Sequence, residues 1–270
     1  MPSDPERCMI SAICVLPDGH ILILDTNNNK VKLLDQQYQV VSHCGVSDGP
    51  IEMCHITPGE VALTVDYRET HEVQFITVIT DQIITGRTIQ LQHACIGIAH
   101  HQGDLFITSK TALYKYSLSG NHISKLYEDE SGNLTVWKCA VSPRGDKLYI
   151  INRNENMLLT LNRNAIVLAP FRDPELKRIG SVHVPHTGQV LVGYGGWGMR
   201  FIQVHSEGIR KLTTIITHMR PLWGIGLAEP VCCNSTISCI SVGQYPGIQS
   251  EIADLYMNSG KYINMRFKLD

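Results

Sequence analysis

Several features that mark large classes of protein are missing from this sequence. No run of about 18 apolar residues occurs, so we expect no membrane-spanning helix. The first residues, MPSDPERCMI, lack the basic start and the apolar core of a secretory signal peptide. No stretch of about 12 residues keeps a convincing apolar stripe at helical spacing. We therefore expect an all-β chain that works in the cytoplasm.

An excess of charge of one sign is also missing. The chain has 23 Lys and Arg against 25 Asp and Glu, which gives a net charge of -2 and a pI of about 6.6. Such a balance creates no strong general attraction to nucleic acids or to anionic membranes. Hydrophobic residues make up 43% of the chain and charged residues 18%, so the apolar material suffices for a large folded core.

Metal-binding patterns are missing despite nine cysteines and 12 histidines. No Cys or Cys/His series has the spacing of a zinc site. The pairs His183/His186 and Cys232/Cys233 come nearest, but neither supplies the four convergent ligands that a tetrahedral site needs. The cysteine count is odd and several cysteines lie in apolar runs, so we expect buried free thiols. We expect no metal and no cofactor.

Catalytic motifs are missing as well. The sequence contains no G-x-S-x-G, H-E-x-x-H or Walker pattern. The glycine-rich run from Gly193 to Gly198 precedes a predicted strand, whereas a phosphate-binding loop precedes a helix whose N-terminus holds the anion. These absences favour a chain that is not an enzyme and that takes no small-molecule substrate.

What the sequence does contain is a repeat. The run ICVLPDGHILILD, from Ile13 to Asp25, has the pattern of a short strand, a tight turn and a second strand. Four similar copies follow, and a weaker one spans Val231 to Gly243. The turn glycines of the first five copies are 40, 44, 42 and 43 residues apart, at Gly19, Gly59, Gly103, Gly145 and Gly188. This is the period of a four-stranded β-propeller blade.

Two further strands follow each hairpin, as in KVKLLD and YQVVSHC of the first copy. The second strands are nearly continuous apolar runs, which is typical of strands buried on both faces. The sequence therefore predicts one domain over residues 1–270, an all-β, six-bladed β-propeller of four-stranded antiparallel blades. The expected blades span approximately residues 8–51, 52–91, 92–135, 136–177, 178–222 and 223–270.

Closure of the ring is the least regular part of this prediction. The first copy begins almost at Met1, so no spare strand is expected upstream of it. We expect the segment from Tyr262 to Leu269 to be the closing strand. The segment from Ser250 to Gly260 fits either a short helix capped by Ser250 or the third strand of the last blade.

The first copy carries a recognisable signature. Asp25 ends the second strand, an Asn-rich turn with Asn28 follows, and Lys30-Val31 begins the third strand. This pattern resembles the NHL repeat, and the chain from about residue 8 to 243 is similar to the NHL propeller of tripartite-motif proteins. The resemblance implies a non-catalytic recognition module that binds a protein partner or a ubiquitination substrate. Ligase activity would need a RING domain, and the sequence has no such zinc pattern.

In a propeller, the loops between second and third strands share one face with the loops that join the blades. Polar and aromatic residues of the types enriched at binding hot spots lie in these loops. We expect partner binding by Asn28, Arg68, Arg153, Trp197, Arg200, Arg220 and Trp223. A protein partner is the first expectation, and no membrane partner is expected.

Two alternatives stay open. Single-stranded RNA would bind on the same face if its basic residues cluster with aromatic ones, although acidic residues lie close to them in sequence. The minor alternative is a calcium-dependent, lactonase-like propeller enzyme. It would need several oxygen ligands from the innermost strands, and Asp48 with Glu52 does not make such a set.

Overall fold

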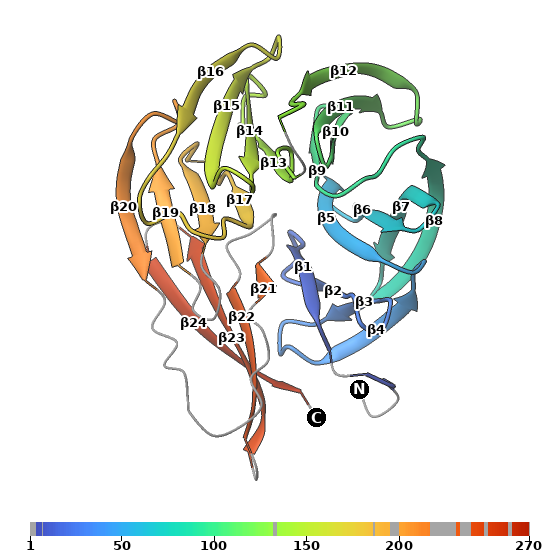
Figure 1. Cartoon of the computed structure of the whole chain (residues 1–270). Coiled ribbons are helices and arrows are strands. Elements are labelled where there is room, and N and C mark those ends of the chain that lie inside the picture. Colours follow the sequence, from blue (N-terminus) through green and yellow to red (C-terminus); the bar gives the residue numbers. More distant parts are fainter. Residues whose placement is uncertain are drawn as a thin grey trace.

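The structure is a computed structural model. It describes residues 4–6, 8–131, 134–185, 187–194, 200–216, 231–232, 239–245, 248–258 and 261–269, with side chains as far as residue 214 except 200. Every regular element in this part of the chain is a strand, and each sheet has four antiparallel strands (Figure 1). The sheets stand around a common axis as the blades of a propeller.

The blades follow the repeat closely, and each is a meander in which neighbours in sequence pair. Blade 1 comprises β1 (Ile10–Val15), β2 (Ile21–Asp25), β3 (Lys30–Leu34) and β4 (Val40–Gly45), and blade 2 comprises β5 (Pro50–Thr57), β6 (Glu60–Tyr67), β7 (Thr70–Ile79) and β8 (Gln82–Gln90). Blade 3 comprises β9 (Ile98–His101), β10 (Asp104–Ser109), β11 (Ala112–Ser117) and β12 (His122–Glu128). Blade 4 comprises β13 (Lys138–Val141), β14 (Lys147–Asn152), β15 (Met157–Asn162) and β16 (Val167–Phe171), and blade 5 comprises β17 (Ser181–His183), β18 (Val190–Tyr194), β19 (Arg200–Val204) and β20 (Lys211–Ile216).

The structure shows five blades, not the six that the repeat predicts. The remaining strands are β21 (Val231–Cys232), β22 (Cys239–Tyr245), β23 (Ile248–Asn258) and β24 (Lys261–Leu269), and they pair in sequence order. The copy of the repeat in this region lacks the turn glycine of the other five, which explains why it overstated the blade count.

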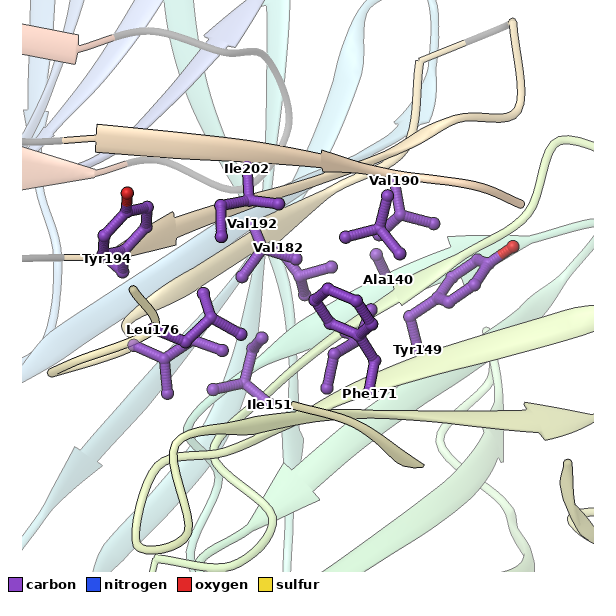
Figure 2. Close-up of a cluster of buried hydrophobic side chains, with 13 residues drawn as sticks. Ala140, Tyr149, Ile151, Phe171, Leu176, Val182, Val190, Val192, Tyr194 and Ile202 are labelled. Atoms are coloured by element: carbon purple, nitrogen blue, oxygen red, sulfur yellow. The ribbon is translucent and has the colours of Figure 1, made fainter. Parts of the chain in front are cut away.

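The core lies between the blades rather than inside any one of them. Each second strand is buried along almost its whole length, and in β10 and β14 this is because a blade packs on each of its two faces. Figure 2 shows one such layer between blades 4 and 5, where Tyr149 and Phe171 of blade 4 point toward Val190 and Ile202 of blade 5. Blades 1 and 2, and blades 2 and 3, share equivalent layers.

The two ends of the propeller differ in their connections. At one end lie the turns between first and second strands and between third and fourth strands, and we call this end the turn face. A hydrogen bond of 2.8 Å from Gln36 Nε2 to the Asp18 carbonyl joins two such turns. At the other end, the loop face, the second-to-third turns meet the blade-to-blade loops, as in the 2.7 Å bond from Asn29 Nδ2 to Asp48 Oδ1.

The first strand of each blade lines the axis. Strand β1 contacts β5, β5 contacts β9, β9 contacts β13 and β13 contacts β17, and β21 lies beside β1 (Figure 1). Each of these strands runs from the loop face toward the turn face. A residue near the start of an inner strand therefore lies near the loop-face end of the axis.

The predicted turn glycines take on different roles. Gly19 has φ +91°, a left-handed conformation that favours glycine in the turn between β1 and β2. Gly59 does not need this conformation, and a Cβ there would lie 3.2 Å from the Val78 carbonyl oxygen. No helix in the described residues is long and apolar enough to cross a membrane. At the C-terminal end, the segment that fitted either a helix or a strand is the strand β23.

We predict that deletion of Lys261 to Asp270 lowers the melting temperature markedly. Strand β24 pairs with β23 at nine positions, and removal of β24 leaves the long strand β23 with one free edge. Thermal unfolding followed by circular dichroism would measure the change. An unchanged melting curve would show that the propeller does not depend on this strand.

Candidate functional site on the propeller axis

The NHL-like signature of blade 1 forms a buried ionic cluster near the loop face. Lys32 Nζ lies 2.6 Å from Asp25 Oδ2, 2.7 Å from Asp4 Oδ2 and 3.0 Å from Cys8 Sγ. Burial alone would lower the pKa of Lys32, but its bonds to Asp25 and Asp4 raise the pKa above its usual range. Burial likewise opposes ionisation of Asp25, yet the bonds it accepts hold its pKa below the ordinary value.

This cluster could be mistaken for a metal site. Asp4, Cys8 and Asp25 form the one group among the described residues whose ligand atoms converge closely enough to hold a metal. The ammonium group of Lys32 bonds to all three, so the cation that balances these groups belongs to the chain itself. The cluster is therefore better explained as a set of ionic contacts that hold the N-terminal segment, with Asp4 and Cys8, against blade 1.

Asn28, one of the predicted partner-binding residues, also holds the N-terminal segment against blade 1. Its Nδ2 donates to Asp25 Oδ2 at 2.8 Å and to the Glu6 carbonyl at 3.0 Å, and its Oδ1 accepts from the Glu6 amide. Both ends of this side chain amide are therefore engaged within the chain. We find a local structural role for Asn28 rather than a free recognition group.

The other predicted residues that the structure describes are Arg68, Arg153 and the backbone of Arg200, and they lie in different blades. Arg68 lies 5.0 Å over the ring of its neighbour Tyr67 in blade 2, and Arg153 lies 4.8 Å over the ring of Trp137 in blade 4. The backbone of Arg200 begins β19 in blade 5 and pairs with Ile216. Trp197, Arg220 and Trp223 lie outside the described residues. The structure places Asn28, Arg68 and Arg153 on three different blades.

Two basic residues of blades 4 and 5 are paired with acidic ones. Lys211 Nζ lies 2.7 Å from Glu175 Oε1 and 3.8 Å from Asp173 Oδ2. Arg172 lies 3.1 Å from Glu155 Oε2. Arg153 and Lys177 are exposed and have no ion pair among the described residues, so RNA binding at this face stays a prediction.

An unexpected ion pair lies on the axis near the loop face. Glu52, in the inner strand β5, is fully buried, and its Oε2 lies 3.0 Å from Lys138 Nζ of β13. The same oxygen accepts a hydrogen bond of 3.1 Å from the Ile98 amide of β9. Three consecutive blades thus meet at one carboxylate. Glu52 is the one acidic residue on the five inner strands β1, β5, β9, β13 and β17.

The geometry of the ring forces this pair onto the axis. Glu52 belongs to blade 2 and Lys138 to blade 4. Their side chains can therefore meet only on the axial side of blade 3, which lies between these two blades. Gly97, just before β9, makes this passage possible: a Cβ there would lie 3.0 Å from Glu52 Oε2 and 2.7 Å from Thr108 Oγ1. It would also lie 3.0 Å from the Lys138 Cα. Any side chain at position 97 would therefore press into the ion pair.

Two buried threonines hold the Gly97 segment in place. Thr64 Oγ1 of blade 2 donates to the Ile96 carbonyl at 2.8 Å. Thr108 Oγ1 of blade 3 accepts from the Gly97 amide at 2.7 Å and donates to the Trp137 carbonyl of blade 4 at 2.6 Å. Each hydroxyl joins neighbouring blades next to the ion pair, so the site has a rigid frame.

The electrostatics of Glu52 are unusual for a carboxylate. Burial raises its pKa to about 7, although the attraction of Lys138 and the bond from Ile98 act in the opposite direction. Glu52 Oε1 has no hydrogen-bond partner among the described residues, which is costly for a buried oxygen. A carboxyl group that is half ionised near neutral pH and has a free oxygen can accept or donate a proton.

Four other titratable side chains on the inner strands are held inactive. Burial raises the pKa values of Cys54 and Cys139, which keeps these thiols protonated and unreactive. Burial lowers the pKa values of His55 and His100, and each ring bonds to a backbone group of the preceding inner strand. His100 Nε2 also accepts from the Gly103 amide at 3.1 Å. Glu52 therefore stands out as the inner-strand group with a free acid–base function.

Sequence reasoning reached Glu52 but set it aside, because it looked for a set of acids that could bind calcium. The overlooked signal was a single acid inside the apolar run of an inner strand, with a lysine at the start of a strand two blades further on. Neither residue alone marks a site. Their contact depends on the curvature of the ring, which the sequence does not display.

Comparisons with known proteins agree on the fold. Residues 8–32 match the NHL repeat, and no curated protein matches the chain. A virginiamycin B lyase from Staphylococcus aureus aligns at 12% identity over 98% of this chain and 87% of that chain, with a TM-score of 0.65. A streptogramin B lyase aligns at 13% identity over 97% and 83%, also with a TM-score of 0.65. A catalytically inactive variant of the S. aureus lyase, with one histidine replaced by alanine and with quinupristin present, aligns at 14% identity over 98% and 85%, with a TM-score of 0.62.

These findings define the chain as a β-propeller with an NHL repeat. Kinship with tripartite-motif proteins is not shown. The prediction of a non-catalytic recognition module, and of a chain that is not an enzyme, is contradicted, because these structural neighbours are lyases. Absence of linear catalytic motifs does not exclude an enzyme, since function depends on sites whose residues come together in the fold.

We predict that Gly97→Ala destabilises the propeller by roughly 1–3 kcal/mol, the typical cost of overpacking a rigid core. The added methyl group would displace Thr108 Oγ1 or the Glu52 carboxylate. Chemical denaturation would measure the free energy of unfolding. Gly103→Ala is an informative control, because no atom lies within 4 Å of a Cβ there and its cost should come from φ +88° alone. Equal stability of wild type and Gly97→Ala would refute the close packing at this point.

Proposed function

We propose that the chain is an enzyme that acts on a small organic molecule at the loop-face end of its axis, with Glu52 as the acid–base group. The observation that carries the proposal is the Glu52 carboxyl, which is buried, has a pKa near 7, and has one oxygen without a partner. A general acid or base works best when its pKa lies near the operating pH. The side chain of Glu52 is 1% exposed, so a substrate would reach Oε1 only if the residues that cover it at the loop face moved.

The reaction class that fits best is proton removal followed by elimination, which is the chemistry of a lyase. Glu52 Oε1 would take the proton from the substrate, while Oε2 stays bonded to Lys138 and to the Ile98 amide. These two bonds would hold the carboxylate in one orientation and limit the cost of its ionisation. The ammonium of Lys138 would also stabilise negative charge that develops on the substrate next to Glu52.

The lyases with this fold lend support to the class of reaction, although their low identity carries the fold alone. One of them loses its activity when a histidine is replaced. In this chain, the inner-strand histidines His55 and His100 already bond to backbone groups, so we assign the proton transfer to Glu52 instead. The calcium-dependent form of this proposal has less support, because a calcium ion needs several oxygen ligands and the five inner strands supply one carboxylate.

We predict that Glu52→Gln abolishes turnover of the substrate. Quinupristin is the first probe to use, and its consumption would be followed by liquid chromatography and mass spectrometry. Removal of a positioned general base lowers the rate by about 100-fold to 10,000-fold. Glu72→Gln is the matched control, because Glu72 is a buried acid on β7, away from the inner strands. Turnover that survives in Glu52→Gln would exclude Glu52 as the base, and a wild type without turnover on a panel of related esters would refute the enzymatic proposal.

The raised pKa of Glu52 predicts a characteristic pH dependence of stability. The folded state binds this proton more tightly than the unfolded state does, so the stabilisation is present below pH 4.5 and is lost as the pH rises through about 7. Glu52→Gln should remove this loss, which is on the order of 3 kcal/mol for a shift of this size. Denaturation of both proteins from acid to neutral pH would measure it. Parallel curves would contradict the raised pKa without bearing on turnover.

A further inference from the structure

Exposed apolar side chains gather at one end of the propeller. Eleven large hydrophobic residues are exposed in the described part of the chain. Two of them, Met9 and Tyr67, lie at the loop face. The other nine lie in the third-to-fourth-strand hairpins that end at the turn face: Val41, Ile79, Ile84, Ile123, Ile166, Val167, Leu168, Ile209 and Leu212. Single exposed hydrophobic residues are ordinary, but their segregation to one end is not.

These residues follow the repeat. The second or third residue of the fourth strand is an exposed aliphatic residue in all five blades: Val41, Ile84, Ile123, Leu168 and Leu212, which are 37–50% exposed. Three blades add an exposed isoleucine close to the turn itself, namely Ile79, Ile166 and Ile209, which are 55–62% exposed. Together they form a collar around the rim of the turn face. The name apolar collar is used below for these eight residues.

Many of the charged side chains beside the apolar collar are paired within the chain. His20 Nε2 lies 2.9 Å from Asp81 Oδ1, Arg87 lies 3.1 Å from Glu60 Oε1, and Lys115 lies 2.7 Å from Asp104 Oδ2. Lys125 pairs with Glu128, and Lys147 lies 2.9 Å from Glu207 Oε1. Arg144, Arg163 and Arg210 in the turns are exposed and have no ion pair among the described residues. The acids Asp18, Asp35 and Asp146 in turns of the same end offset their charge, so the described part of the turn face has apolar side chains among charges of both signs. Such a surface matches a partner without net charge.

We propose that the apolar collar docks the turn face onto the surface of a zwitterionic lipid bilayer. The occupant must reach all five blades at one level, which a flat, continuous surface does. It must also cover side chains that lie one or two residues into the fourth strands. Two residues of a strand span about 7 Å, so these side chains lie about that far from the turns. A bilayer does both, because apolar groups of peripheral proteins sink about 5–10 Å into its interface. A rigid copy of the same rim would contact the turn isoleucines and leave the strand positions exposed.

The experiment is flotation of the full chain with phosphatidylcholine vesicles. The wild type should float with the vesicles, and high salt should not release it, since no net charge is involved. The triple variant Ile123→Ser, Ile166→Ser, Ile209→Ser should bind the vesicles more weakly by a factor of about ten or greater, because it removes three aliphatic anchors. The matched control is Met9→Ser, Tyr67→Ser at the loop face, which should bind like the wild type. All substituted side chains are exposed, and thermal unfolding would verify that each variant folds.

Several results would overturn the proposal. These are a wild type that stays unbound, a triple variant that floats as well as the wild type, or a control that loses binding to the same degree. Binding that needs anionic lipid and disappears in salt would also count against it, because that pattern requires a basic surface. A wild type that does not float but sediments as a dimer, which the triple variant abolishes, would assign the apolar collar to a second copy of this chain instead.

Discussion

Packing of each blade against its two neighbours is the interaction on which the rest of this structure depends. A single four-stranded blade cannot bury its own second strand, and packing of neighbouring blades on both faces buries β6, β10 and β14 along nearly their whole length. The apolar layers therefore fix the angle between blades. That angle in turn brings the inner strands close enough for side chains from blades 2 and 4 to meet across blade 3.

The fold could be predicted from the sequence because local sequence patterns specify each blade. Turn glycines at a period near 43 residues and continuous apolar second strands define a blade without any knowledge of the others. These patterns no longer predict a blade where the sequence of the repeat becomes irregular. Around Val231 to Gly243 the turn glycine is absent, and the count of six blades from the sequence exceeds the five that the structure shows.

The candidate site could not be predicted from the sequence in the same way. Loop residues with attractive chemistry, such as Asn28 and Arg153, are engaged by neighbours within their own blade or by the segment ahead of it. By contrast, Glu52 and Lys138 are 86 positions apart in sequence and on different copies of the repeat. Their contact follows from the curvature of a closed ring and from the missing side chain of Gly97. Neither condition has a signature in a linear pattern of residues.

The opposite placement of the two faces has a consequence for access. Inner strands run from the loop face to the turn face, and Glu52 lies near their beginning, whereas the apolar collar lies at the far rim. A propeller that rests on a surface by its turn face would hold the axial carboxylate toward the water. Its substrate would then arrive from solution, and the surface would serve to concentrate the protein without standing between the reacting group and the molecules it acts on.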